Sequence, residues 1–152
     1  MTRALLCLLA LKTTALAAQQ PSFVGAWQVA YPLGARVENG NVTPQMATGV
    51  LTIVTQADSL VGTLVMDSTP EMPPMPARRL VAKAGAGEAT FVSRSEVTLF
   101  VNFDERKATM INIWNLTIKG DSISGTVERT LEGFGAADQG PLPAVTGSRQ
   151  KG

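Results

Sequence analysis

The chain has 152 residues, which is enough for one ordinary domain and too few for two. Its hydrophobic fraction of 45% and charged fraction of 16% are those of a folded protein rather than a disordered one. With 13 Lys and Arg against 12 Asp and Glu, it carries no electrostatic signature for nucleic acid or an anionic membrane surface. Histidine is absent and there is one cysteine, which excludes Ser-His triads, histidine bases and zinc sites built on His or Cys.

The first segment has the layout of a secretory signal peptide. Arg3 is a short basic region, residues 4–11 are apolar, and residues 15–17 (Ala-Leu-Ala) form a small-residue cleavage site. The apolar run is too short to cross the roughly 30 Å of a bilayer core, so we expect no stable membrane insertion. We expect residues 1–17 to be removed and the protein to be exported, either periplasmic or secreted. The mature chain would then lack Cys7 and any disulfide.

The remaining chain reads as a short tail over 18–22 and one domain over 23–151. Within the domain, runs rich in β-branched and aromatic residues alternate with period two and are separated by turn residues. Such a pattern predicts about seven to nine antiparallel strands in a sandwich or a barrel, and no helix longer than about two turns. The expected strands are 23–31, 49–56, 59–67, 77–84, one bent strand or two short ones over 88–103, 108–119, 122–132 and 144–149.

Four segments are expected to be connections. Residues 32–48 read as a long loop with a short strand near 36–38, and residues 133–143 are rich in Gly and Pro. Residues 104–107 read as a polar hairpin connection. The segment 68–76 holds four prolines and two methionines, with Met66 just before it, and its prolines cannot donate to a sheet ladder. Because methionine-rich loops adapt their shape, this segment is expected either to line an apolar site or to plug one end of the domain.

Two hairpins share one sequence unit. Leu-Thr-Ile is followed by Asp-Ser, an aliphatic residue, any residue, and Gly-Thr, once within 51–65 and again within 116–127. The Asp-Ser pair supplies turn chemistry, and a glycine inside the second strand marks a bend. Two hairpins bent at the same point are what a small closed barrel needs, although two hairpins drawing on the same few turn residues could also coincide.

These residues resemble small exported bacterial lipocalin-like proteins of the calycin type. Gly25-Ala26-Trp27 looks like the Gly-x-Trp that opens lipocalins, and the segment 145–149, ending in Arg149, looks like their last strand. The resemblance covers residues 23–151 and implies an all-β fold, a single antiparallel up-and-down barrel of about eight strands. It also implies that Gly25, Trp27 and Arg149 have a structural role in barrel closure, with Arg149 packed across the Trp27 ring.

The last long strand carries an arginine on its apolar face. Period-two alternation puts Arg129 on the same face as Ile123, Val127 and Leu131. A guanidinium there needs an anionic or carbonyl partner, which could be a ligand carboxylate or phosphate, a group of the protein itself, or solvent at the rim. With the matching faces of the other strands, the candidate ligand-binding residues of the barrel interior are Arg129, Asn112, Trp114, Met110, Met66 and Leu64.

Carboxylates are the remaining acid–base groups. The pair at 104–105 lies in a charged turn, and Glu128 and Glu132 belong to a polar outward face, so we expect no catalytic residue. The favoured interpretation is an exported lipocalin-like module that binds a small, mostly apolar or amphipathic molecule, without metal or cofactor.

Two alternatives remain. The first is a structural or accessory domain whose barrel is filled by its own side chains and whose surface meets a protein partner, and the least favoured is a carboxylate-based enzyme. A continuous cavity of roughly 300 Å³ or more would favour ligand binding over the filled barrel.

Overall fold

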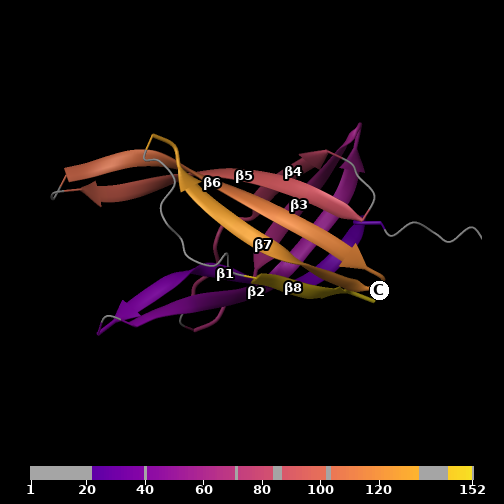
Figure 1. Cartoon of the computed structure of the whole chain (residues 1–152), viewed down its shortest axis with the longest axis horizontal. Coiled ribbons are helices and arrows are strands. Elements are labelled where there is room, and N and C mark those ends of the chain that lie inside the picture. Colours follow the sequence, from indigo (N-terminus) through magenta and orange to yellow (C-terminus); the bar gives the residue numbers. More distant parts are fainter. Residues whose placement is uncertain are drawn as a thin grey trace, which may run out of the picture.

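In the computed structural model, the described residues are 22–39, 41–70, 72–83, 87–101, 104–133 and 144–151. They form a closed barrel in which each strand pairs with its neighbours in sequence and the first strand pairs with the last (Figure 1). No helix occurs among these residues, so the prediction of an all-β, single antiparallel up-and-down barrel is confirmed. The strands are β1 (Gly25–Glu38), β2 (Asn41–Gln56), β3 (Ser59–Met66), β4 (Arg78–Lys83), β5 (Glu88–Val101), β6 (Asp104–Lys119), β7 (Ser122–Leu131) and β8 (Ala144–Arg149).

The segment 32–48 is a hairpin, and the prediction of a long loop with a short strand near 36–38 is wrong. β1 and β2 pair from Gly25↔Ile53 to Glu38↔Asn41, with one register shift between Pro32 and Gly34. Asn39 has a φ of 51°, as a two-residue hairpin turn requires, and an Asn-Gly pair matches the twist of such turns. Pro32 is tolerated because it lies at the irregular position, where a missing donor costs little.

The segment 104–107 also lies in a strand rather than in a connection. β5 and β6 pair without a break from Glu88↔Thr117 to Val101↔Asp104, so 88–101 is one strand and not two. Residues 104–107 are exposed, since this part of the hairpin extends beyond the barrel and tolerates charge (Figure 1). The predicted loop at 68–76 is confirmed for its described residues, whereas residues 134–143 of the predicted loop lie outside the described part.

The barrel has two different ends. The β1–β2 and β5–β6 hairpins project from the same end, which we call the mouth (Figure 1). The opposite end, called the closed end, holds the β2–β3 and β6–β7 turns and the start of the described chain. Between them the interior is filled by buried apolar side chains, among which the bulkiest are Trp27, Trp114, Tyr31, Phe23, Phe91, Leu51 and Ile53.

The first and last strands meet at the closed end. Trp27 pairs with Arg149 in the β1–β8 ladder, and the guanidinium carbon of Arg149 lies 4.1 Å from the centroid of the Trp27 ring. The guanidinium also donates to the carbonyl oxygens of Val24 and Ser22 at 2.7 Å each, and its Nε lies 3.3 Å from a carboxylate oxygen of Asp121. The predicted contact between Arg149 and Trp27 is therefore present, and it joins residues from the two ends of the domain.

The chain ahead of β1 completes the closed end. Phe23 is buried with its ring 5.8 Å from that of Phe91, edge to face, and its carbonyl oxygen accepts a hydrogen bond of 2.8 Å from the Trp27 indole. Gly25 has a φ of +130°, and a Cβ there would lie 2.7 Å from a guanidinium nitrogen of Arg149. The backbone conformation therefore favours glycine, and a Cβ would also displace the Arg149 guanidinium from its present place.

Closure predicts unequal effects of substitutions at the two partners. Trp27→Ala should lower the free energy of unfolding by about 3–5 kcal/mol, because a large buried aromatic is lost. Arg149→Ala should cost about 1–2 kcal/mol, from lost packing and cation–π contact. Chemical denaturation measures both, with the exposed Lys119→Ala on β6 as a control expected to stay within about 0.5 kcal/mol of the parent. Equal losses in the free energy of unfolding for the two variants would contradict the larger contribution expected of Trp27.

Candidate functional site

A row of polar side chains crosses the inner surface of the barrel near the mouth. Ser93, Asn112 and Arg129 are register partners on β5, β6 and β7, and Ser93 and Asn112 are the buried polar residues of the described chain. The next row toward the closed end consists of Phe91, Trp114 and Val127 and is apolar. The interior therefore changes from apolar to polar within one row.

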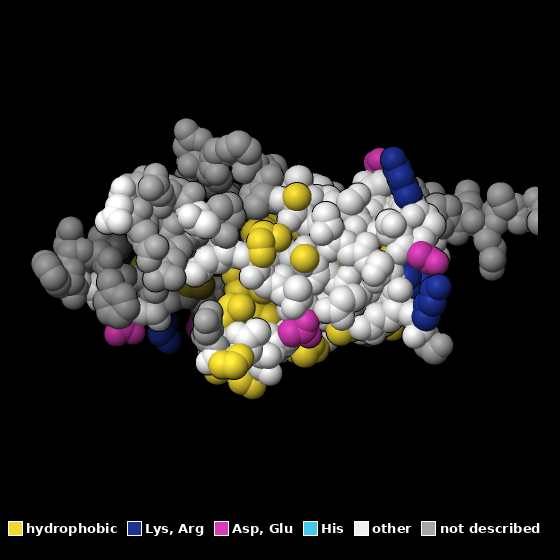
Figure 2. Space-filling view, turned by 90° about the horizontal axis from the view of Figure 1, so that it is seen from below, with side chains coloured by type: hydrophobic (Ala, Val, Ile, Leu, Met, Phe, Trp, Pro, Cys, Tyr) yellow, Lys and Arg dark blue, Asp and Glu magenta, His cyan; other side chains and the backbone are white. Residues whose placement is uncertain are grey.

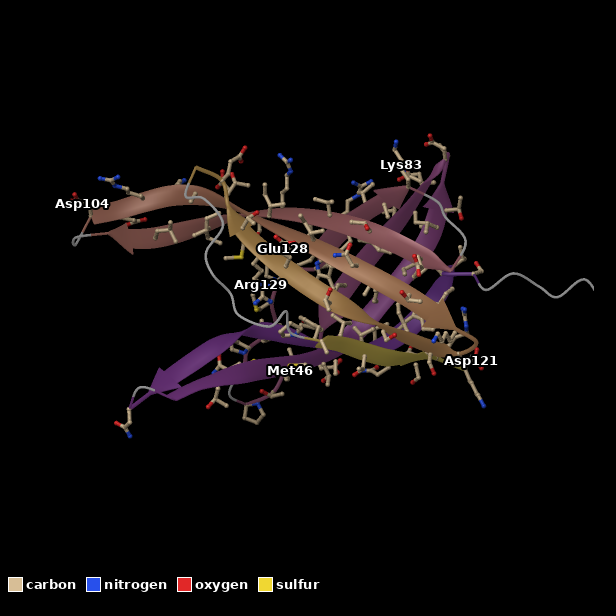
Figure 3. The ribbon with its side chains drawn as sticks, viewed as in Figure 1. Met46, Lys83, Asp104, Asp121, Glu128 and Arg129 are labelled. Atoms are coloured by element: carbon tan, nitrogen blue, oxygen red, sulfur yellow. The ribbon has the colours of Figure 1, made fainter. Side chains whose placement is uncertain are left out.

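Arg129 reaches from β7 across the barrel toward β1 (Figure 3). Its Nε donates to the side-chain oxygen of Asn112 at 3.1 Å, and one terminal nitrogen donates to the carbonyl oxygen of Pro32. The pKa of Arg129 is lowered, mainly because burial disfavours the charge and further because the Arg78 guanidinium is close. The sequence analysis left open an internal partner or a ligand for Arg129, and the structure supplies internal ones.

Tyr31 and Arg78 lie beside Arg129. Tyr31 is 1% exposed, and burial raises the pKa of its phenol, although the charges of Arg78 and Arg129 act in the opposite direction. Arg78 alternates with the inward Leu80 of β4 and is half-buried, yet within the described part of the chain it makes no hydrogen bond or ion pair. We call Tyr31, Arg78 and Arg129 the mouth cluster.

An indole donor lies close to this cluster. Trp114 is 1% exposed, and its Nε1 has no hydrogen-bond partner among the described residues. Its ring lies 5.6 Å from that of Tyr31, centroid to centroid. A buried donor without an acceptor costs about 1–3 kcal/mol, so an acceptor at this point would be stabilising.

A groove lies between β4 and β5. It has a volume of about 510 Å³ and is lined on one side by Met75, Pro76, Arg78 and Arg79 and on the other by Ser93 and Arg94, among others. We call it the β4–β5 groove. By contrast, the recess that Tyr31, Leu64 and Met66 form with Met75, Pro76 and Arg78 has no space for a water molecule. The β4–β5 groove thus offers space at the wall of the barrel, whereas this recess offers none.

All six predicted interior residues lie on the inner surface. Leu64, Asn112 and Trp114 are buried, and Met66, Met110 and Arg129 are half-buried. The sequence analysis missed Tyr31, Arg78 and Ser93. Tyr31 could have been found by continuing the inward alternation of Trp27 along its strand, and Arg78 by continuing that of Leu80. Ser93 could be placed on the inner face only by knowing that β5 is one unbroken strand.

Other candidate features carry no site. The predicted outward position of Glu128 agrees with its place on β7, on the face opposite Arg129, and Glu132 and residues 104–105 are exposed (Figure 3). Across the described ranges, no cluster of three or more acidic, His or Cys side chains is suited to a metal ion. In the same ranges no helix is long and apolar enough to cross a membrane.

The outer surface has a few exposed apolar side chains. Figure 2 shows them gathered near the middle of one face, with most charged side chains toward its ends. Some exposed hydrophobic surface is normal on folded proteins, and we attach no function to these side chains. The large ones in the described chain are Val24, Met46, Val54, Val65 and Met75.

No protein-family model matches the chain, and comparison with curated proteins finds no significant match. Support for the fold and for the mouth cluster therefore comes from the sequence and structure of this chain.

Tyr31 is the single tyrosine of the chain, so its ionisation can be followed by tyrosinate absorbance. We expect a midpoint above 10.0, and a further rise in Arg78→Gln, because Arg78 lowers the Tyr31 pKa. Between the unfolded and the folded pKa, the native state holds a proton that the unfolded state has lost. Stability should therefore be fully present below pH 10.0 and decline as the pH rises through the folded pKa. Tyr31→Phe should remove this part of the alkaline decline; an unshifted midpoint would contradict a buried phenol.

Proposed function

We propose that this protein is an exported lipocalin-like barrel that binds a small amphipathic molecule, with the anionic group of that molecule at the mouth cluster. The observation that carries the proposal is Arg78, a half-buried inward guanidinium without a described partner, close enough to Arg129 to lower its pKa. Two like charges in a partly desolvated site raise the free energy of the protein, and an anion between them offsets that cost.

The surroundings suit a ligand with an apolar body. Leu64, Met66 and Met75 lie around Arg78, and the β4–β5 groove leads to the same residue. Its volume of about 510 Å³ is in the range of small-molecule sites. Methionine side chains adapt to apolar groups of different shape, so we expect selectivity for the anionic group rather than for one apolar skeleton.

The lipocalin-like assignment is part of the proposal. It is supported by the eight-stranded up-and-down barrel and by the positions of Gly25, Trp27 and Arg149 at the closed end. In such a barrel the ligand end lies opposite the closure, which agrees with a mouth cluster built from β1, β4 and β7.

A second candidate function is a structural or accessory domain that meets a protein partner. It is favoured by the large cluster of buried apolar side chains and by the recess beside Tyr31 and Arg78, which has no space for a water molecule. The inward charge of Arg78 favours ligand binding over this alternative, because a barrel filled for stability alone gains nothing from it. A carboxylate-based enzyme remains the least favoured function.

The ligand proposal can be tested by calorimetry with decanoate and the uncharged decanol. Decanoate should bind, and Arg78→Gln should weaken its binding about tenfold or more, equivalent to about 1.4 kcal/mol, with little effect on decanol. Arg106→Gln, an exposed arginine of β6, is the matched control. Equal affinities of the parent for the two probes, or no effect of Arg78→Gln, would refute the anion site. Native mass spectrometry of protein from its host should further show a bound anionic small molecule.

Export has its own test. The protein isolated from its host should begin at or near Ala18 or Gln19, since residues 1–17 have the layout of a signal peptide. N-terminal sequencing of the mature protein measures this, and an intact Met1 would contradict the proposed localisation without affecting the ligand site.

A further inference from the structure

Within the described part of the chain, the boundary between β4 and β5, which we call the seam, is loosely paired. Among the described residues the two strands share a single register pair, Val81↔Val92, whereas every other neighbouring pair of strands shares at least four. The β4–β5 groove opens beside this pair, toward the mouth. We therefore expect residues of β4 and β5 to disfavour further pairing of the two strands.

The register explains why the seam is loose. Continuing the antiparallel pairing from Val81↔Val92 by two residues would put Arg79 directly opposite Arg94 on the outer face. Like charges at opposed positions destabilise a ladder. Arg79 instead leans toward β2, where it donates to the side-chain oxygen of Gln56 at 3.4 Å. Arg94 is exposed and has no polar partner in the described part of the chain.

The loose seam leaves two strand edges facing the groove. Arg78–Leu80 of β4 pair only with β3, and Ser93–Val97 of β5 pair only with β6. Main-chain N–H and C=O groups along such edges are a template for another extended chain. An added strand would run antiparallel to one edge and parallel to the other.

We propose that the β4–β5 groove binds an extended acidic peptide segment of a partner protein as an added strand. An acidic side chain facing outward would lie between Arg79 and Arg94, where their repulsion becomes attraction. An inward acidic or polar side chain would lie next to Arg78, and an inward apolar one next to Leu80. The one acidic residue that lines the groove is Glu96, so the segment should carry no acidic residue at that point.

This inference goes beyond the proposed function and does not depend on it. A small anion at the mouth cluster needs the inward Arg78, whereas an added strand needs main-chain groups and the outward Arg79 and Arg94. Failure of one therefore leaves the other in place.

The test uses fluorescence anisotropy with a short labelled peptide in which Val alternates with Glu, except that Ser replaces the Glu that would lie opposite Glu96. We expect saturable binding, at least about tenfold weaker when Lys replaces Glu and about tenfold weaker when the Val amides are N-methylated. The first comparison tests charge, and the second tests main-chain hydrogen bonds. Equal binding of the N-methylated peptide would overturn strand addition.

Arg94→Glu is the decisive variant. It replaces the repulsion between Arg79 and Arg94 with an attraction between Arg79 and a carboxylate. The ladder between β4 and β5 should then extend toward the mouth, and the groove should close. Peptide binding should fall about tenfold or more, and hydrogen exchange of 78–80 and 93–97 should slow even without peptide. Arg106→Glu makes the same change of charge on β6, away from the groove, and should bind the peptide like the parent.

The exchange measurement also shows that both variants are folded. In the parent, added peptide should slow exchange in the same two segments. Unchanged exchange on peptide addition, or full peptide affinity in Arg94→Glu, would overturn the proposal. Decanoate binding by the parent and by Arg78→Gln, measured without peptide, reports on the mouth cluster.

Discussion

The pairing of β1 with β8 is the constraint on which the rest of the structure depends. An open eight-stranded sheet would expose two edges, and this pairing removes both. The pairing is held where Arg149 covers Trp27, and the charge of Arg149 is compensated there by two carbonyl oxygens and a carboxylate. A guanidinium with that many partners can stay over the indole without an unpaired buried charge.

Closure also determines which side chains face inward. Once Trp27 points into the barrel, period-two alternation along β1 directs Val29 and Tyr31 inward as well. Register then extends the same rule from strand to strand, through Leu51 and Leu64 to Arg78 on β4. The position of the mouth cluster is thus a consequence of the closure at the other end of the barrel.

Much of this fold could be predicted from the sequence, because alternation and turn chemistry are local. The repeated Leu-Thr-Ile unit correctly marked the β2–β3 and β6–β7 hairpins. The same local reasoning failed at 32–48, where two prolines and four glycine or asparagine residues outweighed the strand signal. The pairing between β1 and β2 is what keeps Pro32 in a strand, and it cannot be seen from the proline alone. The charged residues 104–107 were likewise predicted to be a connection, although solvated side chains are equally compatible with an exposed strand.

The site was only partly predictable for a different reason. Arg129 and Asn112 were identified by alternation within one strand each, but their hydrogen bond depends on the register of β6 with β7 and the proximity of Arg78 on barrel closure. The sequence signal for Arg78 is its alternation with Leu80, because an arginine after the proline-rich segment is otherwise an ordinary surface residue. The register with Leu64 then places it on the inner surface.

The consecutive arginines of β4 connect the two proposals physically. Because strand residues alternate, Arg78 faces into the barrel and Arg79 faces out, so one strand presents positive charge to both sides of the same groove. The first charge is half-buried without a described hydrogen bond or ion pair, and the second would oppose Arg94 if the pairing of β4 with β5 continued. Apolar or uncharged residues would serve the fold better at both positions. An anionic partner, at the mouth or along the seam, is the condition under which both arginines become favourable.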